Sequence, residues 1–189
     1  KMFNIIPWNE QLDLDQFYLT AEKKGFFNNS SKKMLVDSFD NEREKQVWIL
    51  YYNSEAIGSV AAHSFDDVMG YNTYRIAART CIFTDKISGS YGTSLRTKDV
   101  ITKNQNPTAQ FLIPTCIDWT PPGSRLFITS NNSIVGTQRR VHTVFCPLME
   151  QVGMMKRIKE VEYRGHIQTV WELFPDEFFN VLNKYKRWK

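Results

Sequence analysis

No segment of the sequence has the length and apolar character of a membrane-spanning helix, and its first residues do not resemble a secretory signal peptide. Cysteine is scarce: Cys81, Cys116 and Cys146 lie in apolar surroundings, and no Cys-x-x-Cys or His-x-x-x-His spacing occurs. Zinc sites are typically built on such spacings, so no metal is expected. An odd number of cysteines in apolar surroundings favours reduced thiols. We therefore predict a cytoplasmic protein that does not enter a membrane.

Charge of one sign is in small excess. The 24 Lys and Arg residues against 20 Asp and Glu residues leave a formal charge of +4, and no dense basic stripe runs along the chain. The most basic segment, Lys184–Lys189, is typical of a helix end whose cations complement the dipole. We expect no nucleic-acid partner, whereas a small anionic ligand is compatible with this charge.

The 189 residues contain no Gly-, Ser- or Pro-rich linker and no internal repeat. Hydrophobic residues make up 42% and aromatic residues 14%, which is enough for a substantial core and argues against disorder. We therefore predict a single α/β domain that spans residues 1–189.

Two helices are expected near the start of the chain. Asp13 and Gln16 have the spacing of a capping box, and the apolar stripe that follows ends at Gly25. A second, shorter helix is expected to begin at Ser30 or Ser31. Both precede the first long β-rich segment.

The β-rich segments are short and separated by polar turns. The second and third are joined by Asn53-Ser54 and the last two turn at Arg164-Gly165, which is typical of hairpins. The expected strands are 3–6, 47–52, 56–62, 74–84, 125–130, 161–163 and 169–173.

Apolar helices are expected at 108–119 and 136–152, between the later strands. Each contains a proline, Pro114 or Pro147, which removes a backbone donor. Apolar residues on both sides of each proline favour a kinked helix; a helix that breaks at the proline is the alternative.

This order of elements resembles the fold of the GCN5-related N-acetyltransferases (GNAT). The nearest passages are Trp48–Gly58, which resembles the second and third strands, and Leu148–Met154, which resembles the end of a helix. The resemblance covers about 3–173 and implies a mixed, mostly antiparallel, twisted sheet of about seven strands flanked by helices. A fainter resemblance is to GNAT-like proteins of tailed phages.

In that family a loop rich in glycine binds the pyrophosphate of acetyl-coenzyme A at a helix N-terminus. The corresponding segment here has lost both glycines, and Pro107 cannot donate its nitrogen. A simple turn before an apolar helix is therefore an equally supported interpretation. If the segment does bind the pyrophosphate, the binding residues are Lys103, Asn104, Gln105, Asn106 and Thr108. Lys103 can supply positive charge, Asn106 can adopt left-handed backbone and Thr108 can donate a hydroxyl. The resemblance also implies that the backbone of Ile82, Phe83 and Thr84 holds the pantetheine arm.

The proton chemistry of the family is altered in this chain. Met149 stands where many members have a tyrosine that protonates the departing thiolate. His142 aligns with the start of the same helix motif and could act as general acid or base, although a hydrogen-bonded packing residue is the favoured alternative. Asp85 is the best-placed carboxylate for a general base, against the alternative of a turn residue. Arg75 and Arg79 on the 74–84 strand, with Arg139 and Arg140 on the 136–152 helix, could contact an anion. Arginines that alternate outward on a half-exposed sheet are the favoured alternative.

The resemblance implies an acyltransferase that transfers an acetyl or other acyl group from acyl-coenzyme A to an amine, carried by a small molecule or a peptide. The missing glycines and Met149 leave open a catalytically inactive GNAT-like binding or regulatory module. A homodimer is compatible with either function.

Overall fold

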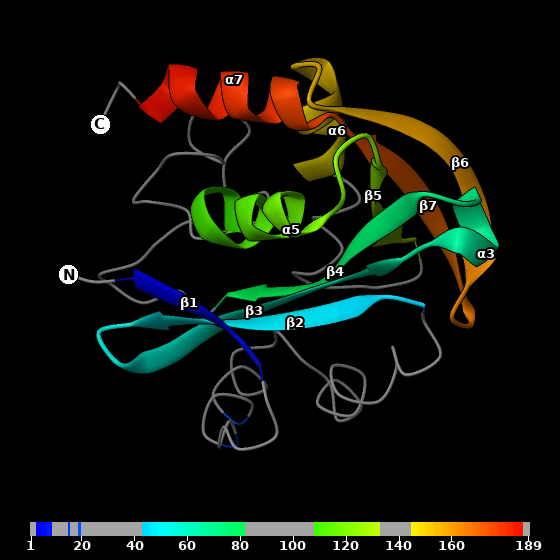
Figure 1. Cartoon of the computed structure of the whole chain (residues 1–189). Coiled ribbons are helices and arrows are strands. Elements are labelled where there is room, and N and C mark those ends of the chain that lie inside the picture. The colour runs from blue at the N-terminus through cyan, green and yellow to red at the C-terminus, as the bar shows by residue number, and fades with distance from the viewer. Residues whose placement is uncertain are drawn as a thin grey trace.

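The computed structural model describes residues 3–8, 15, 19, 43–81, 108–132 and 145–186, with the side chains of 78–81, 108–109 and 185–186 excepted. At its centre is a seven-stranded sheet in the order β1-β2-β3-β4-β5-β7-β6 (Figure 1). The strands are β1 (Phe3–Pro7), β2 (Lys45–Tyr52), β3 (Glu55–Ser64), β4 (Thr73–Cys81), β5 (Arg125–Asn131), β6 (Met155–Tyr163) and β7 (His166–Leu173).

The sheet is mixed, because β4 and β5 are parallel while the other neighbouring strands are antiparallel. The expected fold class is therefore confirmed. The described helical segments are α3 (Asp66–Met69), η2 (Thr108–Leu112), α5 (Ile113–Trp119), α6 (Cys146–Gln151) and α7 (Pro175–Lys186). None of them is long and apolar enough to cross a membrane.

Both predicted hairpins are present, and the backbone geometry of their two-residue turns accounts for the pairing of the strands. Asn53 and Ser54 have φ of 48° and 72°, and Arg164 and Gly165 have φ of 53° and 78°. Positive φ at both central residues is the geometry of a type I′ turn, whose twist matches that of the flanking strands. The register Tyr52↔Glu55 and Tyr163↔His166 follows directly from these two-residue turns.

The two helix prolines lie at a change of helical geometry. Pro114 is in the first turn of α5, directly after the π-helical turn η2, and Leu112, the last residue of η2, keeps right-handed helical backbone. A wider π turn accommodates a missing donor without ending the helix. Pro147 occupies the same position in α6, after Phe145. The first part of that expected helix, 136–144, lies outside the described residues.

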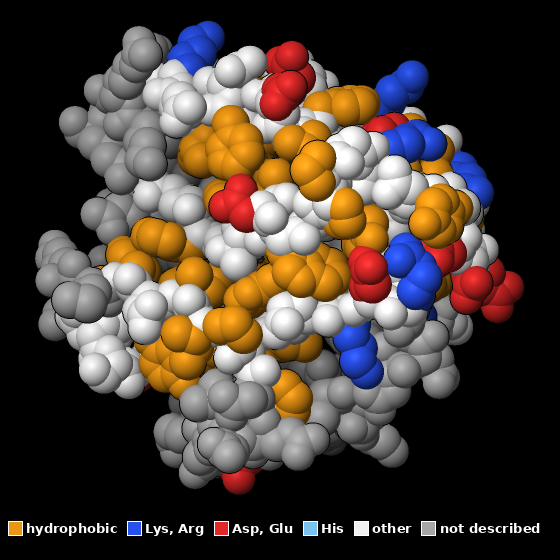
Figure 2. All heavy atoms as spheres, viewed as in Figure 1, with side chains coloured by type: hydrophobic (Ala, Val, Ile, Leu, Met, Phe, Trp, Pro, Cys, Tyr) orange, Lys and Arg blue, Asp and Glu red, His pale blue; other side chains and the backbone are white. Residues whose placement is uncertain are grey.

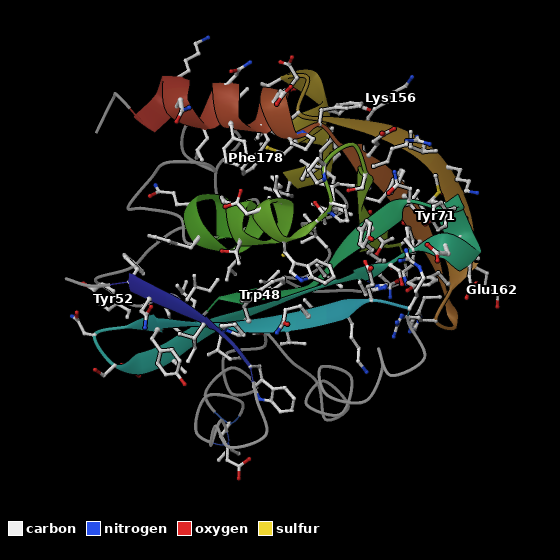
Figure 3. All side chains as sticks on the ribbon, in the orientation of Figure 1. Trp48, Tyr52, Tyr71, Lys156, Glu162 and Phe178 are labelled. Carbon is white, nitrogen blue, oxygen red and sulfur yellow. The ribbon has the colours of Figure 1, made fainter. Side chains whose placement is uncertain are left out.

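The main core fills the space between the sheet and helices α5, α6 and α7, which cover one face (Figure 1). Trp48 points from the sheet toward α5 and Phe178 projects from α7 (Figure 3). The ring of Trp119 at the end of α5 meets those of Trp48 and Tyr74 edge to face, each at 5.8 Å. Figure 2, viewed from the same side as Figure 1, shows hydrophobic side chains on the surface of that side of the molecule.

A smaller core lies on the opposite face of the sheet. Phe65, Phe127 and Val170 are its buried members, and α3 and strand β6 contribute partly buried side chains. Side chains of a strand alternate between faces, so Tyr74 and Ile76 of β4 belong to the main core while Arg75 points to this second face.

Elements β6, β7 and α3 differ from the sequence-based expectation, and β7 begins at His166 rather than at 169. Strand β6 begins at Met155 rather than near residue 161, because most of its side chains are exposed and charged and give no alternating apolar pattern. The polar segment after β3 contains the short helix α3. The expected helices at 13–25 and 30–39 lie outside the described residues, except that Asp15 and Leu19 are helical.

Candidate ligand site between strands β4 and β5

The parallel strands β4 and β5 separate along their length. They pair only through Thr73↔Arg125, Tyr74↔Leu126 and Arg75↔Phe127. Both strands continue beyond that point, and each stays paired on its outer side: β4 with β3 as far as Cys81, and β5 with β7 as far as Asn131. The two strands therefore form a fork, whose arms are 76–81 of β4 and 128–131 of β5.

The β4 arm contains a β-bulge. Ala61 lies opposite Ala77, and Ser59 lies opposite Thr80, so a three-residue step on β4 faces a two-residue step on β3. The extra residue interrupts the ladder, bends the strand and leaves main-chain groups outside the regular pairing. Residues 78–79, at the bulge, lie three to four residues beyond Arg75, the last residue of β4 that pairs with β5.

Two polar groups beside the β4 arm lack partners. The Ser59 hydroxyl is fully buried, and it lies opposite Thr80 beside the bulge. The side-chain nitrogen of Gln110 is shielded from solvent in η2, which packs on β4. Neither atom has a hydrogen-bond partner within the described part of the chain. A buried polar group without a partner carries a desolvation cost, so the Gln110 nitrogen favours a polar ligand at the β4 arm. Ser59 lies on β3, on the side of β4 away from β5.

A network of side chains spans the closed end of the fork on the second face. Arg75 Nε donates to Thr129 Oγ1 at 2.8 Å, and Arg75 Nη1 lies 3.2 Å from His63 Nε2. The guanidinium carbon lies 5.0 Å from the centre of the Tyr163 ring, within cation–π range. Arg75 is thus a structural link between β3, β5 and the β6–β7 hairpin.

His63 is neutral in this network. Its Nδ1 donates to the carbonyl of Ser64 at 2.8 Å, which leaves Nε2 as the acceptor for Arg75. Burial first, and then the charges of Arg75 and Arg164, lower the pKa of His63 to about 3. The imidazole therefore acts as a fixed acceptor, not as a proton-transfer group near neutral pH.

The helix face of the β5 arm carries a second hydroxyl. Trp171 Nε1 on β7 donates to Ser130 Oγ at 2.8 Å, in a buried contact. The sequence analysis did not single out Ser130, Ser59 or Gln110. The sequence did contain a sign of them: each is a polar residue inside an otherwise apolar strand or helix. A polar residue that is buried in such an element usually has a specific hydrogen-bond partner.

Most of the predicted site residues lie outside the described residues. This holds for Ile82, Phe83, Thr84, Asp85, Lys103, Asn104, Gln105, Asn106 and His142, whose roles stay predictions. Thr108 is the first residue of η2. Met149 of α6 is 1% exposed and belongs to the main core, so this position packs the interior and provides no proton donor.

A separate hollow of about 620 Å³ lies at the opposite end of β5. It is lined by the end of α5, the loop before β5 and the start of α7, and Asp118, Asp176 and Glu177 give it an acidic character. Ser124 and Leu126 place it at the start of β5, whereas the fork opens beyond Phe127. The hollow is therefore not part of the fork.

Comparison with known proteins gives similarity in structure alone. No family model and no curated protein matches the sequence. An acetyltransferase from Streptococcus agalactiae is 15% identical, with a TM-score of 0.53, over 91% of this chain and 98% of the other. A GNAT family acetyltransferase from Elizabethkingia anophelis, solved with acetyl-CoA bound, is 14% identical, with a TM-score of 0.51, over 90% and 97%.

The aminoglycoside N-acetyltransferase AAC(6')-Ib11 is a third structural neighbour, 11% identical, with a TM-score of 0.55 over 94% of this chain and 99% of its own. At these identities the agreement concerns the fold. It extends over nearly the whole of each chain, and it includes the element order that the sequence analysis compared with this family. The chain therefore has the fold of the GCN5-related N-acetyltransferases.

Proposed function

We propose that the protein is an acyltransferase that transfers an acetyl or related acyl group from acyl-coenzyme A to an amine. The observation that carries this proposal is the β4–β5 fork, with its bulge in the β4 arm. An extended ligand that contains amides can lie along the edge of a strand whose neighbour has moved away, since main-chain groups then bind it as another strand would. The pantetheine arm of coenzyme A is such a ligand.

The residues near the fork fit this ligand. The buried side-chain nitrogen of Gln110, which has no partner within the described part of the chain, lies in η2 beside β4, where an amide or phosphate oxygen would satisfy it. In this proposal Ile82, Phe83 and Thr84 extend the same strand edge. The pyrophosphate then lies near the start of η2, bound by Lys103, Asn104, Gln105, Asn106 and Thr108, since helix N-termini favour anions.

When bound, acyl-coenzyme A supplies a thioester carbonyl that a neutral amine can attack. The chain then has to orient the amine, stabilise negative charge on the carbonyl oxygen and transfer protons. In this proposal, main-chain N–H groups at the bulge, 78–79, would donate to that oxygen. Asp85 would accept the proton of the attacking amine and His142 would donate one to the departing sulfur.

A binding or regulatory module with the same fold is the second candidate. The observation that favours it is the buried Met149, at the position where the family has its proton donor. Such a module would still bind a ligand in the fork but would release no thiol.

Titration calorimetry with coenzyme A, pantetheine and adenosine 3′,5′-bisphosphate tests the proposal. We expect coenzyme A to bind and pantetheine to bind more weakly. Binding of the nucleotide fragment by itself would measure the contribution of the phosphate site proposed at the start of η2. No binding of any of them at millimolar concentration would remove the proposed function. Thiol release from acetyl-coenzyme A with a panel of primary amines then distinguishes the enzyme from the module.

Gln110→Ala is the variant for the same experiment, because the side-chain nitrogen of Gln110 has no hydrogen-bond partner among the described residues. We expect weaker binding of coenzyme A by about fivefold to tenfold, the loss of one hydrogen bond. Thr115→Ala, one turn further along the same helix, is the matched control, since the Thr115 hydroxyl already donates to Phe111 O at 2.7 Å. An equal effect of both variants would indicate damage to the helix rather than loss of a ligand contact.

A further inference from the structure

Arg75 occupies the position where the fork opens. It is the last residue of β4 that pairs with β5, opposite Phe127. Its side chain reaches Thr129, two residues further along β5, in the part that has already separated from β4. One side chain therefore connects the two strands beyond the end of their main-chain ladder.

The anchoring of Arg75 makes this connection rigid. Beyond the bond to Thr129, the guanidinium contacts His63 Nε2 on β3 and the face of Tyr163 on the β6–β7 hairpin. Thr129 is 5% exposed and His63 is fully buried, so water has little access to these contacts. Contacts of a charged group that exclude water are stronger than exposed ones, and a planar guanidinium bound on several sides loses its rotational freedom.

The direction of the link is also informative. Phe127 and Thr129 lie on the second face of the sheet, with Arg75, whereas Tyr74 and Ile76 face α5. The link therefore crosses the second face of the fork and does not extend to the helix face. Strands that lack a shared ladder can move apart or close together, and a side-chain link at the closed end limits both movements.

We propose that Arg75 is a positioning residue: through Thr129 it holds the arms of the fork at the separation that the acyl-coenzyme A arm requires. This inference rests on the proposed function, because it assigns the separation to that ligand. Arg75 does not touch the reacting atoms. Its effect is to hold the main-chain groups of the β5 arm at a constant position relative to those of the β4 arm before the ligand binds.

The test compares Thr129→Val, which keeps the shape of the side chain but removes the acceptor, with Thr129→Ser, which keeps the hydroxyl. We expect T129V to weaken coenzyme A binding about tenfold by calorimetry. In the acyl transfer assay the KM for acyl-coenzyme A should rise by a similar factor, with kcat within about twofold. T129S should behave like the wild-type chain. Arg75→Lys, which can bind one partner but not all of them, should shift affinity in the same direction.

Hydrogen exchange measured without ligand provides a second readout, since it does not depend on activity. We expect faster amide exchange in 76–81 and 128–131 of T129V, with unchanged exchange in β1, which lies three strands from β4 in the sheet. A folded T129V with wild-type exchange and wild-type affinity would overturn the positioning role. Faster exchange with unchanged affinity would also overturn it. A wild-type chain that binds no coenzyme A would instead overturn the proposed function, and the positioning role with it.

Discussion

His63 shows how a single residue acquires a property that its type does not predict. A histidine ordinarily titrates near neutrality, but burial, the Arg75 charge and the hydrogen bond from Arg75 to Nε2 keep this one neutral. The side chain therefore serves as an acceptor for a cation. The catalytic imidazole proposed for this protein, at position 142, has no such restriction placed on it by the sequence.

The pH dependence of stability should report this neutral state. The folded pKa of His63, about 3, is below the ordinary value of 6.5, so the unfolded chain binds the proton more readily. Stability is then independent of this group above about pH 6.5 and falls as the pH drops from there toward 3, by at most about 1.4 kcal/mol per pH unit. Urea denaturation between pH 4 and pH 7 measures this slope.

His63→Gln is the matched variant for that measurement, because its amide oxygen can accept from Arg75 and does not titrate. We expect the variant to lose less stability than the wild-type chain on acidification, even if it is less stable at pH 7. Parallel pH profiles of the two proteins would show that His63 does not contribute to acid sensitivity.

At the scale of elements, the two hairpin turns provide a comparison within one chain. Both turns are type I′, but the second central residue is Ser54 in one and Gly165 in the other, with φ of 72° and 78°. Left-handed backbone disfavours a side chain, and no atom lies within 4 Å of a Cβ added at Gly165. The backbone alone should therefore decide the effect of substitution at either position.

We expect Ser54→Gly to stabilise the protein by about 0.5 kcal/mol, since relief of the left-handed strain exceeds the added flexibility of the unfolded chain. Gly165→Ala should destabilise it by about 1 kcal/mol for the same reason. Chemical denaturation of both variants tests the pair. Changes of the same sign would contradict a backbone origin.

At the scale of the whole molecule, α7 joins the last strand to the main core. Phe178 is 1% exposed and packs among residues of the sheet and helices, whereas its neighbour Phe179 is only partly buried at the edge of the same core. Because both residues lie on α7, substituting each in turn distinguishes the contribution of core packing to stability from that of the helix itself.

Phe178→Ala should lower the free energy of unfolding by about 3–4 kcal/mol, through lost burial and the cavity left behind. Phe179→Ala should have a clearly smaller effect, about 1–2 kcal/mol, because solvent already reaches that ring. Thermal and urea unfolding of both variants measure the difference. Equal losses would mean that α7 contributes through its backbone placement rather than through the core.

The strands, their approximate bounds and both hairpins could be predicted from the sequence, because β-rich runs and two-residue turns are local properties of the chain. The resemblance to the GNAT fold also came from local order, and the structural neighbours confirm it at the level of fold. Strand β6 was predicted too short, because an exposed edge strand with charged side chains carries no apolar alternation.

The candidate site depended on contacts between distant parts of the chain. Arg75 and Thr129 are 54 residues apart, and whether a strand arginine meets solvent or a buried threonine cannot be read from its neighbours in sequence. The three-pair ladder between β4 and β5 and the bulge opposite Ser59 are likewise set by how the sheet twists once all strands have assembled. The sequence by itself thus determined which segments become strands and where they turn. Only the tertiary structure decided where two of them separate, because that separation depends on packing across the whole sheet.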